Sequence, residues 1–340
     1  MSGFRDVVGH KDIIDYITNV TKEKKLSHAY ILNGEKGSGK TLLAKLFALA
    51  IQCEGTTDED GPCKACPSCK QGVNENQPDI IWVTHEKPNA ISVDDIRVQV
   101  NNTVDIRPYR SPYKIYIIEQ ADLLTVQAQN ALLKNIEEPP SYVIFILLTR
   151  NAEILLETIR SRCVILRLRN IKNSLVKKYL TERLNVSRDR VDLCVAFAGG
   201  NIGRAVMLAE SENFNQIRGE VIRILVGIKE LELDQVPSTV KTIENLEKIA
   251  NDEEEKFTKS DLLDLFAVWY RDVLMYKATK SVDMVVFKDQ MPGIKGQATT
   301  SSYEGIEKIL KGIENAKARL AANVNVELTL ELLILTMMEN

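Results

Sequence analysis

Eight consecutive residues near the start of the chain, 34–41, have the sequence Gly-Glu-Lys-Gly-Ser-Gly-Lys-Thr. A β-prone run precedes them, and leucines at helical spacing follow. In that context the pattern G-x-x-x-x-G-K-[ST] lets backbone N–H groups surround phosphates, while Lys40 adds positive charge and Thr41 offers a hydroxyl to Mg²⁺. We therefore expect a phosphate-binding loop for ATP or ADP with Mg²⁺. Its nucleotide-binding residues are Gly34, Gly37, Gly39, Lys40 and Thr41. A retained loop that binds nothing is the alternative.

β-prone runs alternate with helical patterns through the first half of the chain, as in a parallel sheet with crossover helices. After residue 168 the β pattern ends and the remaining segments have helical periodicity. The sequence predicts an α/β domain at 1–168, a small helical domain at 169–210 and an all-α domain at 211–340. The five expected strands are residues 29–33, 79–83, 115–119, 143–149 and 164–168.

Polar residues at fixed spacing indicate where several helices begin. Ser92 followed by Asp95 has the capping-box spacing, and so does Ser301 followed by Glu304. The last helix is expected to begin near Asn325.

Length, charge and hydropathy indicate the number of domains and argue against a bulk nucleic-acid binder and a membrane protein. A chain of 340 residues exceeds what one hydrophobic core usually organises, so two or three domains are expected. With 44 basic and 47 acidic residues, a net charge of −3 argues against binding nucleic acid by bulk electrostatics. The N-terminus has no apolar secretory core and no run of 18 apolar residues occurs, which predicts a cytoplasmic protein without a membrane segment.

The third expected strand ends in Glu119-Gln120-Ala121-Asp122. In nucleotide-hydrolysing P-loop proteins an acidic residue here helps to hold Mg²⁺, and a neighbouring acid activates the attacking water. Glu119 can still contact a metal ion, but the neutral amide of Gln120 cannot accept a proton at a useful pKa. We therefore expect little or no nucleotide turnover by the isolated chain. Asp122 is the alternative base.

Four of the six cysteines fall between positions 53 and 69. Their short spacings allow successive thiolates to converge on one tetrahedral ion, and disulfides are rare in a cytoplasmic chain. Cys53, Cys63, Cys66 and Cys69 are therefore predicted to hold a structural Zn²⁺ ion, with an iron–sulfur cluster or four unmetallated thiols as the alternatives.

Five further motifs accompany the phosphate loop. They are Phe-Arg-Asp-Val-Val-Gly-His at 4–10, Ser-His-Ala-Tyr at 27–30, Gln-Asn-Ala-Leu-Leu-Lys at 129–134, Glu-Glu-Pro-Pro at 137–140 and Ile-Arg-Ser-Arg-Cys at 159–163. Together they resemble the clamp-loader branch of the AAA+ proteins. The resemblance implies a RecA-like P-loop domain, a helical lid, and a helical collar that joins a five-subunit ring. Such a ring opens a sliding clamp and places it on primed DNA.

Within that branch, Glu119-Gln120 in place of the usual Asp-Glu makes the chain more similar to the delta prime family of the bacterial DNA polymerase III clamp loader than to the gamma/tau motors. This resemblance implies a non-motor subunit, a stator, that acts with gamma/tau and delta subunits and meets the beta clamp and primed DNA through the complex. The alternatives are an active gamma/tau-like ATPase and a free-standing AAA+ DNA-processing ATPase.

The resemblance also implies roles for single residues. Arg162 is expected to reach the γ-phosphate held by a neighbouring motor subunit, where its permanently charged guanidinium stabilises the transferring group. The alternative is an ordinary surface arginine. Thr149 matches the polar first sensor of nucleotide. Gly203 stands where a second-sensor arginine is usual, and Arg204 follows one residue late, about 100° further around a helix.

Overall fold

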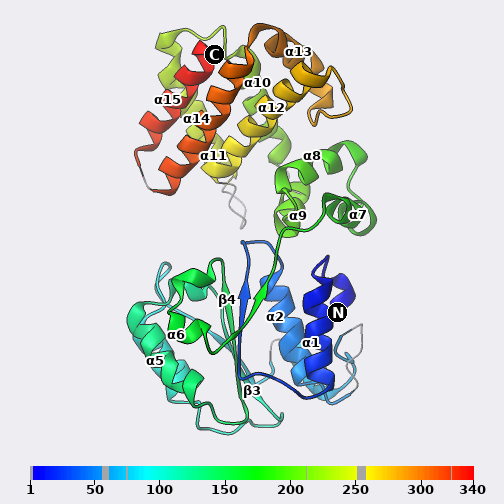
Figure 1. The fold of residues 1–340 in the computed structure, drawn as a ribbon, viewed down its shortest axis with the longest axis vertical. Helices are drawn as coiled ribbons and strands as arrows, with labels where there is room; N and C mark the ends of the chain where they lie inside the picture. The colour runs from blue at the N-terminus through cyan, green and yellow to red at the C-terminus, as the bar shows by residue number, and fades with distance from the viewer. Residues whose placement is uncertain (1–2, 56–60, 74–75, 212, 251–257, 323) are drawn as a thin grey trace. The chain divides into compact units, whose positions relative to one another are not determined.

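The computed structural model describes residues 3–55, 61–73, 76–211, 213–250, 258–322 and 324–340. The chain divides into two compact units (Figure 1). The first contains Met1–Val176 and Gly200–Gly203, and the second contains Lys177–Gly199 and Arg204–Asn340. The predicted division into three domains stays a prediction.

A five-stranded parallel sheet forms the centre of the first unit, in the order β2-β3-β4-β1-β5. The strands are β1 (Ala29–Asn33), β2 (Ile80–Val83), β3 (Lys114–Ile118), β4 (Val143–Thr149) and β5 (Val164–Arg167). β3 and β4 are buried along their whole length, which explains why both are almost continuously apolar in sequence. The predicted RecA-like α/β fold is confirmed.

Helices cover both faces of this sheet (Figure 1). On one face, Tyr30 of β1 contacts Phe47 edge-on, with ring centroids 4.9 Å apart, in a core shared with α1 and α2. On the other face, Tyr116 and Phe145 stack at 5.4 Å among residues of α4 and α5. The helical segments are η1 (Phe4–Asp6), α1 (Lys11–Lys22), α2 (Lys40–Ile51), α3 (Pro67–Val73), α4 (Val93–Ile96), the π-helical η2 (Arg97–Asn101), η3 (Ala121–Leu123), α5 (Val126–Glu137), η4 (Ala152–Ile154) and α6 (Glu157–Arg160).

The described residues of the second unit form helices and the loops that connect them, with no strand. Trp269 is fully buried and its indole N–H donates to Gln297 at 2.8 Å, while Gln297 donates to the carbonyl of Leu225. These bonds join three helices, because the residues belong to α12, α13 and α10. The segments, some of which begin in the first unit, are α7 (Asn173–Arg183), α8 (Arg188–Ala198), α9 (Ile202–Glu210), α10 (Phe214–Gly227), η5 (Leu233–Gln235), α11 (Val236–Ala250), α12 (Lys259–Thr279), η6 (Lys288–Gln290), α13 (Met291–Thr300), α14 (Tyr303–Ala321) and α15 (Val326–Glu339).

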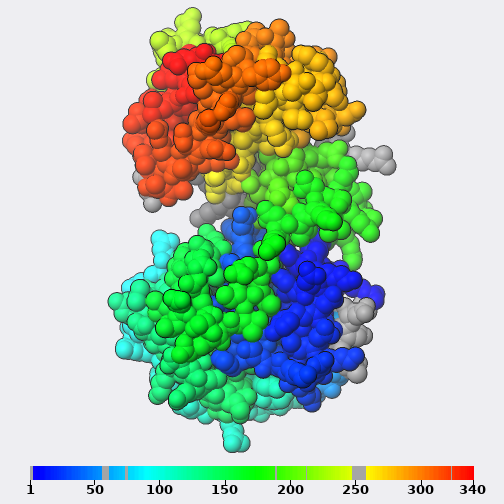
Figure 2. Space-filling model, viewed as in Figure 1, coloured from blue at the N-terminus to red at the C-terminus, as the bar shows by residue number. Residues whose placement is uncertain are grey.

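The last two helices, α14 and α15, pack side by side and reach the surface (Figure 2). Asn325 caps α15 by accepting the N–H of Leu328 at 2.9 Å, as predicted. The predicted cap of α14 is wrong by one residue, because Ser302 accepts the N–H of Gly305 whereas Ser301 is buried. None of the described helices is both long and apolar enough to cross a membrane.

Candidate functional site

The phosphate loop connects β1 to α2. Gly37 and Gly39 have φ angles of 81° and 89°, a left-handed conformation that side chains other than glycine rarely adopt. Nothing lies within 4 Å of a Cβ built on Gly39, so this glycine is required for its backbone conformation rather than for space. α2 begins at Lys40, so its free N–H groups face the loop and favour an anion there.

Lys40 and Thr41 turn toward the loop and the end of β3. The Lys40 ammonium donates to the carbonyls of Gly34, at 2.5 Å, and Glu35, at 2.8 Å. Burial lowers the pKa of Lys40, and the nearby Asp122 carboxylate partly offsets this effect. The Thr41 hydroxyl donates to the Glu119 carboxylate at 2.7 Å. A hydroxyl and a carboxylate in contact at a phosphate loop are the oxygen ligands that Mg²⁺ prefers.

The residue after Glu119, where the acid that activates water is usual, has no carboxylate, and the carboxylate of Asp122 is paired with Arg150. Gln120 is exposed and has a left-handed backbone, φ 52°, where the chain turns into η3. Asp122 accepts the N–H of Arg150 at 3.2 Å and lies 3.6 Å from the Arg150 Nε. The alternative base is therefore engaged by a cation.

Thr149 ends β4 directly beside Asn33, the last residue of β1. Its carbonyl accepts the N–H of Gly34, which joins the strand end to the phosphate loop. The Thr149 hydroxyl is buried, donates to the carbonyl of Asn151 at 3.1 Å and accepts the Asn151 N–H at 3.2 Å. Thr149 thus lies beside the phosphate loop, and its hydroxyl is hydrogen-bonded to the backbone of Asn151, two residues later.

Arg162 follows the short helix α6 and is partly exposed. Its Nη1 donates to the carbonyl of Thr158 at 3.0 Å and approaches the Ser161 hydroxyl at 3.4 Å. Its Nη2 lies 3.1 Å from a carboxylate oxygen of Glu137, the last residue of α5. No local sequence pattern pairs Arg162 with Glu137, because 25 positions separate them.

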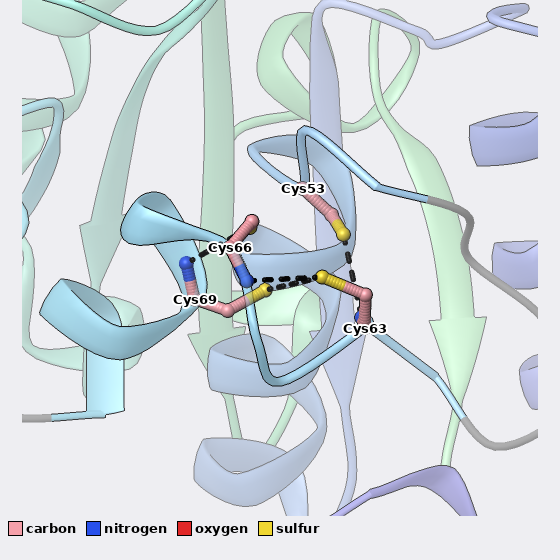
Figure 3. A group of neighbouring side chains, drawn as sticks. All are labelled: Cys53, Cys63, Cys66 and Cys69. Atoms are coloured by element: carbon pink, nitrogen blue, oxygen red, sulfur yellow. Dashed lines mark hydrogen bonds between the residues drawn. The ribbon is translucent and has the colours of Figure 1, made fainter.

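The four clustered cysteines converge in space (Figure 3). Their sulfur atoms all lie within 4.8 Å of one another, and the Cys63 and Cys69 sulfurs are 3.9 Å apart. Two sulfurs bound 2.3 Å from one tetrahedral zinc ion lie about 3.8 Å apart, so these side chains fit that ion. A Cβ on Gly55 would lie 2.9 Å from the Cys63 sulfur, so glycine leaves room for the cluster.

Backbone amides point to the sulfurs of Cys53, Cys63 and Cys66, and at Cys63 their effect on the pKa exceeds that of burial. The N–H of Cys66 points to the Cys63 sulfur at 3.4 Å, and the amides of Cys66 and Ala65 lower the pKa of Cys63 to about 6. Burial instead raises the pKa of Cys53 and Cys69. A metal ion would supply the positive charge that offsets this cost, because thiolates are the species that bind metal.

Comparison with known proteins gives matches to both ends of the chain. The family described as "DNA polymerase III, delta subunit" matches residues 9–172, and "DNA polymerase III, delta subunit, C terminal" matches residues 229–339. DNA polymerase III subunit delta prime of Bacillus subtilis (strain 168) is 30% identical over 336 residues, which cover 96% of this chain and 95% of that protein. The chain belongs to the DNA polymerase III delta prime family.

Another subunit of DNA polymerase III is also similar in sequence. DNA polymerase III subunit tau of Bacillus subtilis (strain 168) is 31% identical over 303 residues, 84% of this chain and 52% of tau. The chain therefore spans about half the length of tau. A solved gamma subunit-related protein from Thermotoga maritima aligns over 96% of this chain and 98% of its own, at 18% identity and a TM-score of 0.49. A likeness this low adds nothing to the assignment.

In this delta prime family member, position 203 contacts the phosphate loop through its backbone. The N–H of Gly203 donates to the carbonyl of Gly37 at 2.8 Å. A Cβ on residue 203 would lie 2.6 Å from the Cα of Gly37, so no larger side chain fits without backbone movement. The Asn201 amide donates to the carbonyl of Lys36 at 2.7 Å. The sequence pattern did not indicate this contact of Asn201.

Arg204 is held elsewhere. Within the second unit, its guanidinium lies 2.8 Å from a carboxylate oxygen of Asp261 and donates to Asp264, which also accepts from Lys317. Two carboxylates therefore engage the arginine that follows Gly203, the position where the sequence predicted a second sensor.

Proposed function

We propose that this chain is a non-motor subunit of the DNA polymerase III clamp loader, acting with gamma/tau and delta subunits to place the sliding clamp on primed DNA. The observation that carries the proposal is the match along 95% of a delta prime subunit. Glu119-Gln120 beside a complete phosphate loop supports it, since a motor needs an acid where Gln120 stands. The subunit reaches the clamp and DNA through the complex.

Its catalytic contribution is Arg162, which acts in trans on the nucleotide of a neighbouring ATPase subunit. The guanidinium is always charged and presents several N–H donors in one plane, which matches the oxygens of a transferring phosphoryl group. Its side chain is 40% exposed, so a second subunit can approach it. Arginine fingers contribute about 10³- to 10⁵-fold to the rate in other NTPases.

The chain's own loop binds ATP or ADP with Mg²⁺ but turns it over slowly. Gly34, Gly37 and Gly39 let the backbone follow the phosphates, Lys40 compensates their charge, and Thr41 and Glu119 would hold Mg²⁺, with Thr149 beside them. Bound Mg²⁺ would neutralise phosphate charge. Because Gln120 cannot accept a proton, the water is left without its usual base.

The four cysteines hold a structural Zn²⁺ ion. Four thiolates form a closed tetrahedral site, in which no position remains for a reacting water. Cys53, Cys63, Cys66 and Cys69 come from a segment that leaves the sheet domain after α2 and returns before β2. The ion closes this segment on itself and so fixes the surface that it presents.

The proposal is tested by substituting Arg162 in the reconstituted complex. Arg162→Ala should lower the ATPase rate of the complex by about 10³-fold, because the transferring phosphoryl group loses its cation. The complex should still assemble, because the exposed pair of Arg162 with Glu137 adds little to the stability of the fold. ATP hydrolysis with clamp and primed DNA gives the rate, and size-exclusion chromatography follows assembly. Arg169→Ala, at an exposed position beyond β5, is the matched control.

Two outcomes would contradict this function. An ATPase rate unchanged by Arg162→Ala excludes the arginine finger. Turnover by the isolated chain at the rate of an active motor subunit excludes the non-motor assignment and favours a gamma/tau-like enzyme.

A further inference from the structure

Three groups surround the guanidinium of Arg162, and they come from the end of α5, from α6 and from the residue that follows α6. Glu137 ends α5, and its carboxylate lies 3.1 Å from Nη2. Thr158 belongs to α6, and its carbonyl accepts from Nη1 at 3.0 Å. Ser161 offers its hydroxyl at 3.4 Å. Of these three acceptors, only Glu137 carries a charge, and only Glu137 comes from another part of the chain.

Helix stability does not account for an acidic residue at this position. The C-terminal end of a helix carries a partial negative charge, so a carboxylate in the last turn is unfavourable there. α5 nevertheless ends in Glu137, and Glu138 follows it as the C-cap residue. The last turn of α5 contains one basic residue of its own, Lys134, and a second cation, Arg162, reaches Glu137 from outside the helix.

The ion pair also adds little to the stability of the fold. The side chains of Arg162 and Glu137 are 40% and 44% exposed, and water weakens a pair so placed. The ion pair has a larger effect on the orientation of the Arg162 guanidinium. A free arginine side chain samples many rotamers, and each one that points away from the substrate reduces the population able to react.

We propose that Glu137 is a positioning residue for Arg162. Its carboxylate holds the guanidinium at the end of α5, so that the arginine meets the neighbouring subunit already ordered. The pair leaves further N–H groups of the guanidinium for phosphate oxygens, since a guanidinium has five. The inference rests on the proposed role of Arg162 and adds the residue that orients it.

Glu137→Gln tests this inference in the reconstituted complex. Glutamine keeps the length of the side chain and removes its charge. We expect kcat for ATP to fall about tenfold, since displacing a positioned group by 1 Å can cost about 10²-fold. KM should stay within about twofold, because Glu137 acts through the orientation of Arg162, whose proposed contribution is to the transition state. Glu137→Asp keeps the charge and should give an intermediate kcat.

The melting temperature separates positioning from a structural role. Removing a negative charge from the last turn of α5 should leave the melting temperature unchanged or slightly higher, although kcat falls. Glu138→Gln removes the same charge one residue further on and is the matched control. Its kcat should equal that of the unaltered complex.

Adding Glu137→Gln to Arg162→Ala completes the test. If Glu137 acts through Arg162, the second change should lower kcat no further. A full effect of Arg162→Ala with an unchanged kcat for Glu137→Gln would overturn this inference and leave the proposed function standing. A tenfold fall that persists in the Arg162→Ala background, or that Glu138→Gln reproduces, would overturn it as well. No effect of Arg162→Ala would overturn both proposals.

Discussion

Gly203 contacts the phosphate loop at Gly37 through main-chain atoms alone. At position 203, where the resemblance predicts a second-sensor arginine, Gly203 instead places its backbone N–H against the phosphate loop. The distance of 2.6 Å from a built Cβ to the Gly37 Cα involves backbone, which cannot move as a flexible side chain can. Main-chain atoms of Gly203 therefore pack against the phosphate loop, at a position where no arginine side chain is available.

Gly203→Ala should destabilise the protein by about 1–3 kcal/mol, the usual cost of overpacking. The intrinsic helix preference acts in the opposite direction, since alanine is favoured over glycine by about 1 kcal/mol. Gly219 in α10 is exposed, and nothing lies within 4 Å of a Cβ built on it. Gly219→Ala should therefore stabilise the protein by about 1 kcal/mol, the difference in helix preference. Urea denaturation of both variants measures the two free energies. Stabilisation by Gly203→Ala would show that residue 203 does not press on the loop.

The segment that carries the four cysteines contacts the sheet domain at places other than its predicted metal site. α3 packs on α2, where a Cβ on Gly72 would lie 2.0 Å from a Leu49 methyl group. Ser68 donates to Glu54 at 2.7 Å, and Arg110 lies 3.6 Å from the same carboxylate. Metal loss should therefore loosen this segment and leave the sheet folded.

Metal analysis and amide hydrogen exchange test this expectation. Purified protein should contain about one zinc ion per chain. Chelation should speed exchange at residues 63–73, while the amides of β3 and β4 stay protected, because their hydrogen bonds lie in the buried sheet. Cys66→Ala should lose the metal, whereas Cys163→Ala, outside the cluster, should keep it. Iron in place of zinc, or protein without metal, would contradict the assignment.

The division into two compact units determines how the whole molecule should unfold. The first unit has its own parallel sheet and the second has its own helical core around Trp269. Chains built in this way commonly depart from two-state unfolding.

We expect calorimetry to resolve two transitions, of which ADP with Mg²⁺ raises only one. The phosphate loop lies entirely in the first unit, and a ligand at 100 times its dissociation constant adds about 2.7 kcal/mol to the state that binds it. Lys40→Ala should abolish the shift without removing either transition. A shift of both transitions, or none at saturating ADP, would contradict a nucleotide site confined to this unit.

Much of the fold follows from signals that span only a few residues. The β-prone runs that alternate with helical patterns predicted all five strands. The predicted capping box at Ser92 and Asp95 is also present, because the Ser92 hydroxyl accepts the Asp95 N–H at 3.2 Å. The predicted cap at Ser301 is wrong because two serines stand together, and packing buries the first of them. The serine pattern predicted the start of α14 to within one residue, and the burial of Ser301 leaves Ser302 as the cap.

The sequence by itself determined the phosphate loop, the alternation of strands and helices, the cysteine cluster and the missing acid at Gln120. These features depend on residue type and on spacing along the chain. Only the tertiary structure decided the strand order, the contact of Thr41 with Glu119, the position of Gly203 on the loop and the pairing of Arg162 with Glu137. Each joins residues far apart in sequence, where no local preference acts and the packing of whole elements sets the distance.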